Sequence, residues 1–194
     1  MREVAMHKGR LEAFTDGVIA VIITIMVLEM KVPHGSDIAA LASTLPVFLT
    51  YVLSYTNVAI FWNNHHHMLQ VSQHVDGRSL WANMFLLFWL SLVPFMIRWM
   101  EETDFVALPT AAYGFVLVMA AIGYLLLERM LIACNGADST LARAIGGELK
   151  GKLSISIYAV AMLLAFVQPW IAIALYIAVA ILWFVPDRRI ESII

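Results

Sequence analysis

The sequence predicts an all-α membrane protein that forms one domain over residues 1–194, with six transmembrane helices and no separate soluble domain. Hydrophobic residues make up 62% of the chain and charged residues 13%, against about 45–50% and about 25% in soluble proteins. So few charges cannot cover a surface that faces water, whereas a surface that faces lipid needs none. The formal net charge of -2 provides no positive surface for nucleic acid, so no nucleic-acid partner is expected.

The first predicted helix covers residues 11–31, because residues 17–28 are apolar apart from Thr24. Crossing the hydrocarbon core of a bilayer takes about 20 such residues, with a range of roughly 17 to 25. Pro33 follows in a polar turn and is expected to end this helix, since proline interrupts helical structure.

The second helix is predicted at residues 38–69, which is longer than a membrane needs, so its polar end at residues 63–67 should project from one face. The third is predicted at residues 78–100 as one helix, and an acidic connection follows it. The fourth is predicted at residues 109–133, with Pro109 suited to the first helical position.

A polar loop is predicted at residues 134–147, after the fourth helix. The fifth and sixth helices are predicted at residues 148–168 and 170–185, joined by a tight turn at Pro169. An even number of spans places both termini on the same side of the membrane.

Lysine and arginine are distributed unevenly between the two sides of this topology. If both termini are cytoplasmic, ten of the twelve basic residues lie inside, and only Lys31 and Arg98 lie outside. Multi-pass proteins show this bias, so it predicts cytoplasmic termini. The outer side carries acidic residues instead, namely Glu29, Asp37, Glu101, Glu102 and Asp104.

One face of the first helix carries an ionisable residue and then an apolar stripe. An ionised carboxylate in hydrocarbon costs about 3 kcal/mol on insertion scales, so Asp16 should face protein or water. The stripe itself has the composition of a lipid-facing surface or of a protein core, and its composition does not decide its role. Positions three and four apart share a helix face, which places on one stripe, from Asp16 onward, Gly17, Val21, Thr24, Ile25 and Leu28.

The head of the first helix reads Arg-x-x-x-Phe-Thr-Asp at residues 10–16. This motif resembles the Arg-x-x-x-Phe-Ser-Asp signature of the potassium channels called transmembrane protein 175, which occur in lysosomes and in prokaryotes. Residues 17–29, 61–66 and 90–95 are also similar to the prokaryotic members. The length matches the six-helix prokaryotic form, which implies a location in the inner (plasma) membrane.

The resemblance implies a homotetramer whose first helices line a central pore for K+ and other monovalent cations, with no cofactor, no metal site and no catalytic residue. In the family, bulky apolar side chains form the pore constriction, at positions that fall here on Val21, Ile25 and Leu28. A hydroxyl beside the constriction is implicated in potassium preference and falls on Thr24. The family signature joins the first helix to its neighbours, and its positions here are Arg10, Phe14, Thr15 and Asp16.

A pore of this kind gates by excluding water from an apolar constriction, and its selectivity follows from the cost of removing water from the ion. Potassium holds its water less tightly than sodium and therefore passes more easily. Apolar rings offer no replacement oxygens, so we expect weak selectivity, with partial compensation by Thr24. Val21 stands where a larger isoleucine or leucine is usual in the family, which predicts a wider opening.

Three consecutive histidines, residues 65–67, end the second predicted helix. They point in different directions and cannot share one metal ion. We expect one of the first two to pack inward and to hydrogen-bond the signature residues, with partners at the same depth at the start of the third helix. The residues expected in this signature network are Arg10, Phe14, Thr15, Asp16, His65, His66, Trp81 and Asn83.

Two other functions are compatible with the sequence. An ion- or proton-coupled transporter would use Asp16, Glu29 and the second-helix histidines as a relay, and a structural membrane protein would conduct nothing. Transporters often show internal repeats and helices broken at mid-membrane, and neither is visible in the sequence. No pattern of nucleophile and base indicates an enzyme.

Two further expectations concern packing and surface charge. Gly114, Ala120 and Gly123 predict close helix packing in the fourth helix, because small residues let helix backbones approach. Arg98 with Glu101 or Glu102 is expected to form a surface pair that contributes little to stability.

Overall fold

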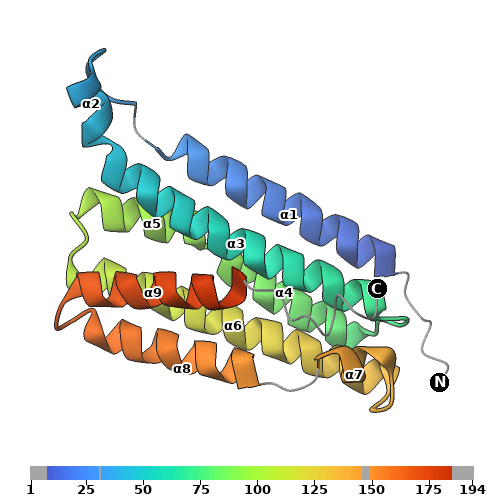
Figure 1. Ribbon diagram of the computed structural model, residues 1–194. Coiled ribbons are helices and arrows are strands. Elements are labelled where there is room, and N and C mark those ends of the chain that lie inside the picture. Colours follow the sequence, from blue (N-terminus) through green and yellow to red (C-terminus); the bar gives the residue numbers. More distant parts are fainter. Residues whose placement is uncertain (1–7, 31, 146–148, 185–194) are drawn as a thin grey trace.

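The computed structural model describes residues 8–30, 32–145 and 149–184, and all of the regular structure in these ranges is helical. The long helices lie side by side and run alternately up and down the bundle (Figure 1). The predicted all-α class is therefore confirmed. The helices are α1 (Lys8–Leu28), α2 (Ile38–Ser43), α3 (Leu45–Val71), α4 (Gly77–Ser91), α5 (Val93–Glu102), α6 (Ala107–Asn135), α7 (Thr140–Ile145), α8 (Leu149–Leu164) and α9 (Pro169–Phe184).

Four helical stretches of the described chain are long and apolar enough to cross a membrane: α1, α3, α4 together with α5, and α6. The shortest of them has 21 residues, which extends over about 30 Å at about 1.5 Å per residue. The last two helices, α8 and α9, have 16 residues each, or about 24 Å, and form the predicted hairpin at Pro169. Each of the six stretches predicted from the sequence is thus mainly helical where the structure describes it, with α1 ending at Leu28 and α8 at Leu164.

Two predicted helices are each interrupted near a proline. The stretch at residues 38–69 divides into α2 and α3 two positions before Pro46. The stretch at residues 78–100 divides into α4 and α5 two positions before Pro94. Proline has no backbone N–H and its ring clashes with the carbonyl one turn earlier, which explains both interruptions. The second predicted helix therefore begins at α3 instead of residue 38, whereas α4 and α5 still form the one predicted span, interrupted only at Leu92.

The connection after α6 also differs from the prediction, because it contains the short helix α7. The preceding helix ends at Gly136, whose φ of 96° lies in the left-handed region that favours glycine. Just before it, the Asn135 Oδ1 accepts hydrogen bonds from the backbone N–H groups of Gln73 and His74, at 2.8 and 2.9 Å. These bonds fix the α3–α4 connection to the end of α6. The predicted end of the sixth helix at residue 185 lies outside the described residues.

The centre of the bundle is α6, which packs against α4, α5, α8 and α9. Its glycines allow this packing, as the sequence predicts. A Cβ at Gly123 would lie 2.9 Å from the Leu86 Cα on α4, and a Cβ at Gly114 would overlap the Tyr176 hydroxyl on α9. The fully buried Ala120 lies between these two glycines.

Hydrogen bonds between buried polar side chains join α3 to α6 and α8. The Ser54 Oγ and the Tyr113 hydroxyl are 3.0 Å apart, and the Tyr158 hydroxyl donates to the Asn57 Oδ1 at 3.3 Å. These groups are buried among membrane-length helices, where an unpaired polar group would cost several kcal/mol, on the order of 2–7. The bonds therefore fix α3 to the core, and α3 in turn supports α1.

The basic residues of the described chain are distributed unevenly between the two ends of the bundle, with all of them except Arg98 toward one end. We call the two ends the basic end, where α1 begins and α3 ends, and the acidic end, where α1 ends and α5 ends. The described basic residues toward the basic end are Lys8, Arg10, Arg78, Arg129, Arg143, Lys150 and Lys152. The described acidic residues at the acidic end are Glu29, Asp37, Glu101, Glu102 and Asp104.

The contact at Gly123 predicts a loss of stability when a methyl group is added. Gly123→Ala places its Cβ against the backbone of α4, which cannot move aside as a flexible side chain could, so the free energy of unfolding should fall by about 1–3 kcal/mol. Thermal unfolding of the purified protein in detergent measures the change. The matched control is Gly77→Ala, because no heavy atom lies within 4 Å of its added Cβ. Equal melting temperatures for the two variants would contradict the close approach of α4 and α6.

Candidate pore-lining site

The first helix, α1, lies at the edge of the bundle, so one side of it is packed and another is not (Figure 1). Its contacts within the subunit are with α3, α4 and α5. The buried residues on the packed side recur every three or four positions, at Leu11, Thr15, Ile19, Ile22 and Met26. The rest of its circumference has few contacts within the described chain.

The residues predicted for the constriction lie on this unpacked side. Val21, Ile25 and Leu28 are 56%, 40% and 77% exposed. They therefore do not belong to the core of the subunit, which was one interpretation of the stripe. In a membrane-spanning chain, an exposed apolar stripe contacts lipid, another subunit or a pore.

Thr24 belongs to this stripe and is also exposed. Its hydroxyl donates to the Ala20 carbonyl oxygen at 2.8 Å, within the same helix. That bond occupies the hydroxyl hydrogen and leaves the oxygen's lone pairs free to accept. The Thr24 side chain therefore presents an oxygen ligand on an otherwise apolar part of α1.

The signature threonine belongs to a buried network that joins three helices. Asn83 of α4 donates through its Nδ2 to the Thr15 Oγ1 at 3.0 Å, and its Oδ1 lies 2.9 Å from the His65 Nε2 of α3. Because the amide oxygen can only accept, the Nε2 of His65 is the donor. All three side chains are buried, so α1, α3 and α4 are held together by polar groups that water does not reach.

The signature aspartate has a different partner. The Trp62 Nε1 of α3 donates to the Asp16 Oδ1 at 2.7 Å. The Trp62 ring stacks on His66 one turn later, with the ring centroids 5.7 Å apart. Thr15 and Asp16 are neighbours on α1 and so point to different helices, Thr15 to α4 and Asp16 to α3. Together they fix the rotation of α1 about its own axis.

Three members of the expected network lie outside it. Trp81 is 78% exposed, because residues two apart on a helix point to different sides, and its neighbour Asn83 takes the inward position. Phe14 and Arg10 are exposed at the start of α1. The expectation of a direct bond from a histidine to the signature is also corrected, since Asn83 lies between His65 and Thr15.

Sequence reasoning missed Lys8, at the basic end. Its Nζ donates to the carbonyl oxygens of Leu69 and Ser72, at 3.2 and 3.3 Å. The last carbonyls of a helix have no partner within it and carry partial negative charge, which a lysine satisfies. A lysine just before an apolar helix was visible in the sequence, but its partner is 61 residues away.

The helix α4 is positioned by its own cap. The Asp76 carboxylate accepts from the backbone N–H and the hydroxyl of Ser79, at 2.8 and 2.7 Å. Desolvation opposes ionisation here, but the bonds from Ser79 and the nearby Arg78 outweigh it and lower the pKa of Asp76. This cap fixes the first turn of α4 and so helps to position Asn83, which lies further along the same helix.

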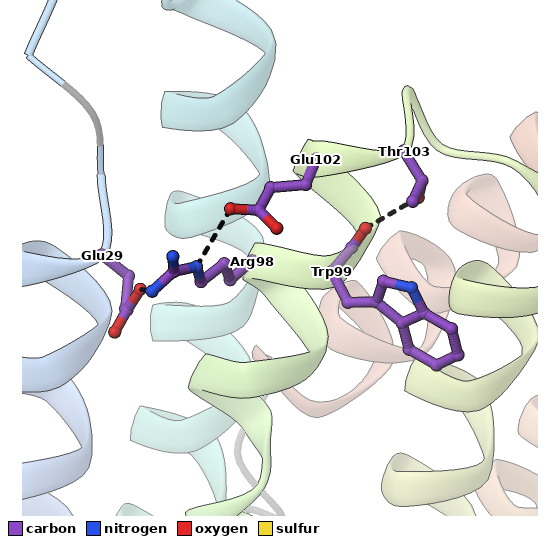
Figure 2. A network of polar contacts seen from close by, with 5 residues as sticks. All are labelled: Glu29, Arg98, Trp99, Glu102 and Thr103. Carbon is purple, nitrogen blue, oxygen red and sulfur yellow. Dashed lines mark hydrogen bonds and ion pairs between the residues drawn. The ribbon is translucent and has the colours of Figure 1, made fainter.

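At the acidic end, Glu29 follows directly after α1 and accepts from Arg98 of α5 (Figure 2). The Arg98 Nη1 is 2.6 Å from the Glu29 Oε2, and its Nε donates to the Glu102 Oε1 at 3.1 Å. The surface pair expected between Arg98 and Glu102 is present. The contact with Glu29, 69 residues away in the sequence, was not predicted.

These features together define the class. The chain is a multi-pass helical membrane protein whose edge helix presents an apolar stripe, and the described residues hold no cluster of His, Cys, Asp and Glu that could bind a metal ion. A family model described as endosomal/lysosomal potassium channel TMEM175 matches residues 10–94. That match spans every residue of the candidate site from Arg10 to Asn83.

The sequence is 50% identical over 187 residues to a potassium channel of Chryseobacterium sp. (strain P1-3), which covers 96% of this chain and 97% of that one. The crystal structure of a lysosomal potassium-selective channel TMEM175 homologue from Chamaesiphon minutus is similar in fold, with a TM-score of 0.78 and 26% identity, covering 93% of this chain and 97% of that chain. The chain belongs to the TMEM175 family, a family of ion channels and not of enzymes.

A vertebrate relative is similar over a shorter stretch. The human endosomal/lysosomal proton channel TMEM175 is 37% identical over 96 residues, which cover 43% of this chain and 19% of that one. The bacterial relatives are thus named for potassium and the human one for protons.

The network around Asn83 predicts a large effect on stability. Asn83→Ala leaves buried Thr15 and His65 without partners, so the free energy of unfolding should fall by about 1–3 kcal/mol for each. Melting curves of the purified protein in detergent measure the loss. Asn63→Ala is the matched control, because Asn63 is exposed on the adjacent helix α3. Should both variants melt at the wild-type temperature, the network would not be holding α1.

Proposed function

We propose that the chain is the subunit of a homotetrameric channel of the inner membrane that conducts K+ and other monovalent cations with weak selectivity. The observation that carries this proposal is the exposed apolar stripe of α1, on a helix whose other side is packed. The Chryseobacterium relative, named as a potassium channel over nearly the whole length, supports the same ion.

In the proposed assembly, four copies of α1 surround a shared axis and turn their stripes toward it. Val21, Ile25 and Leu28 then form three successive apolar rings, about 6 Å and about 4.5 Å apart along the helix at a rise of about 1.5 Å per residue. A pore lined in this way empties of water when it narrows, because apolar walls give water no hydrogen bonds.

Weak preference for potassium follows from the same geometry. An ion that passes an apolar ring loses part of its hydration shell and gains no protein oxygen there, and the loss is smaller for potassium than for sodium. The Thr24 hydroxyl donates its hydrogen to the Ala20 carbonyl, and its oxygen can still accept or bind a cation. It therefore replaces part of the water that the ion loses. Val21 is smaller than isoleucine or leucine, and four of them leave a wider ring.

The polar contacts of α1 take a definite role in this proposal. A helix turns by about 100° for each residue, so a shift of one position would carry the stripe away from the axis. Thr15, Asp16 and Lys8 are bonded to the subunit on the other sides of α1 and oppose such a rotation. They keep the stripe directed toward the neighbouring copies.

The orientation that we propose places the basic end in the cytoplasm, with both termini there. The described basic residues cluster at that end, as multi-pass proteins favour. The acidic end then faces outward, where its carboxylates attract cations to the entrance of the pore.

The alternative of a coupled transporter has less support. A relay would need polar side chains between Asp16 and Glu29, which are 13 positions apart on one helix, or about 20 Å. Asp16 is bonded to Trp62 in the first half of α1 and Glu29 to Arg98 just beyond its end, and the stretch between them is apolar apart from Thr24. The second-helix histidines, residues 65–67, lie toward the basic end and do not connect Asp16 to Glu29.

The constriction is tested by placing a polar group in one ring. Ile25→Asn should raise basal K+ flux through the purified protein in liposomes by about tenfold or more, because an amide keeps the ring hydrated. The matched control is Val27→Asn, on the same helix and similarly exposed (43%) but off the stripe, and its flux should stay at the wild-type level. Equal flux for the two variants would place the stripe elsewhere than in a pore. An intact wild-type protein that passes no K+ would overturn the proposed function itself.

The width of the Val21 ring is tested by enlarging it. Val21→Ile adds one methyl group in each subunit and should strengthen the preference for potassium over sodium. The measurement is the reversal potential when sodium replaces potassium on one side of a planar bilayer, with Val27→Ile as the control. An unchanged reversal potential would show that position 21 does not set selectivity.

A further inference from the structure

Just past the end of α1, Glu29 forms an ion pair with Arg98 of α5, and this contact lies beside the most exposed of the three residues predicted for the constriction. Glu29 comes directly after Leu28, which is 77% exposed. Figure 2 shows the Arg98 side chain extending from α5 between Glu29 and Glu102. Two nitrogens of one guanidinium thus contact two carboxylates, one just past the end of α1 and one on α5.

The helix that carries Arg98, α5, is packed against the core of the subunit. Its opposite side is buried in the core through Val93, Ile97 and Met100. Its last turn is closed by the Thr103 hydroxyl, which donates to the Trp99 carbonyl oxygen at 2.7 Å (Figure 2). Arg98 therefore reaches α1 from a helix that is itself fixed to the subunit.

The packing of α1 against α5 is incomplete near this contact. An open groove runs between the two helices, lined by Ile25, Ser91, Pro94 and Phe95 and bordered by the charged residues. Apolar contact alone therefore leaves room for the end of α1 to move. The ion pair crosses the groove and joins its two sides.

We propose that Arg98 is a positioning residue that draws the acidic end of α1 back against its own subunit and so sets the width of the pore at Leu28. This inference rests on the proposed function, in which α1 lines the pore. Glu29 is bonded to Arg98 of its own subunit, so the attraction acts toward α5 and away from the neighbouring subunits. It opposes the tendency of four apolar Leu28 side chains to meet as water leaves.

We expect Arg98 to affect the position of the end of α1 more than the stability of the folded subunit. Exposed ion pairs contribute little to the free energy of folding, and Arg98, Glu29 and Glu102 are all partly exposed. The pore has two states in this proposal, one held open and one closed at its outer ring. The same weak contact is made in each of the four subunits, and all four contacts favour the open state.

If Arg98 acted only through its charge, Arg98→Gln would change the current in the opposite direction. The three side chains carry one net negative charge, and Arg98→Gln raises it to two. If the group only attracted cations to the entrance, this variant would conduct more. If Arg98 holds α1 back, the variant closes more often and passes less current.

The test uses single-channel recording of the purified full-length protein in planar bilayers. Arg98→Gln should lower the open probability roughly fivefold, since four weak contacts are lost together. Exchanging the charges in Glu29→Arg with Arg98→Glu restores an attractive pair and should return the open probability toward the wild-type value. Arg143→Gln, an exposed arginine on α7, is the matched control and should leave it unchanged.

A second measurement keeps the inference independent of conduction. A spin label at Met30→Cys, in a Cys134→Ala background, reports the mobility of the end of α1, which should increase with Arg98→Gln and return with the charge exchange. If Ile25→Asn alters K+ flux as proposed but Arg98→Gln leaves open probability and label mobility unchanged, the inference is overturned and the proposed function stands. An increase in current with Arg98→Gln would also overturn it, in favour of simple attraction of cations.

Discussion

A polar side chain among membrane-spanning helices must find its partner within the protein, because lipid offers none. This constraint explains the contacts that organise the subunit. Asn83 can lie buried on α4 only because it bonds Thr15 on one side and His65 on the other. The same requirement joins Asn57 to Tyr158 deeper in the bundle. Satisfying these groups fixes the relative rotation of helices that hydrophobic packing alone would leave less specified.

The edge helix α1 depends on this constraint most, because only one of its sides packs against the subunit. At the basic end it is held by Lys8 and by the bonds of Thr15 and Asp16, and at the acidic end by Glu29. Between these two sets of contacts the helix presents apolar side chains outward. A helix fixed by its ends and free along one face suits a pore wall, since neighbouring copies can approach it without disturbing the core.

The family model matches the part of the chain that contains the candidate site. The family model covers residues 10–94, which contain α1 and its polar partners on α3 and α4. The helices beyond it, centred on α6, supply the packed core against which those elements rest. The arrangement recurs in a channel structure with 26% identity, which shows that much of the sequence can change while the bundle is kept.

The sequence by itself determined the class, the helical stretches and the close packing at Gly123, because each depends on local composition or on residue size. It also contained the two interrupting prolines, Pro46 and Pro94, although apolar length suggested continuous helices. Only the tertiary structure decided which side of α1 is packed, why Asn83 rather than Trp81 turns inward, and which carboxylate Arg98 reaches across 69 residues. Helical periodicity gives the spacing of residues on a face but not the direction of that face, which is set by how helices cross and by which polar partners lie at the same depth.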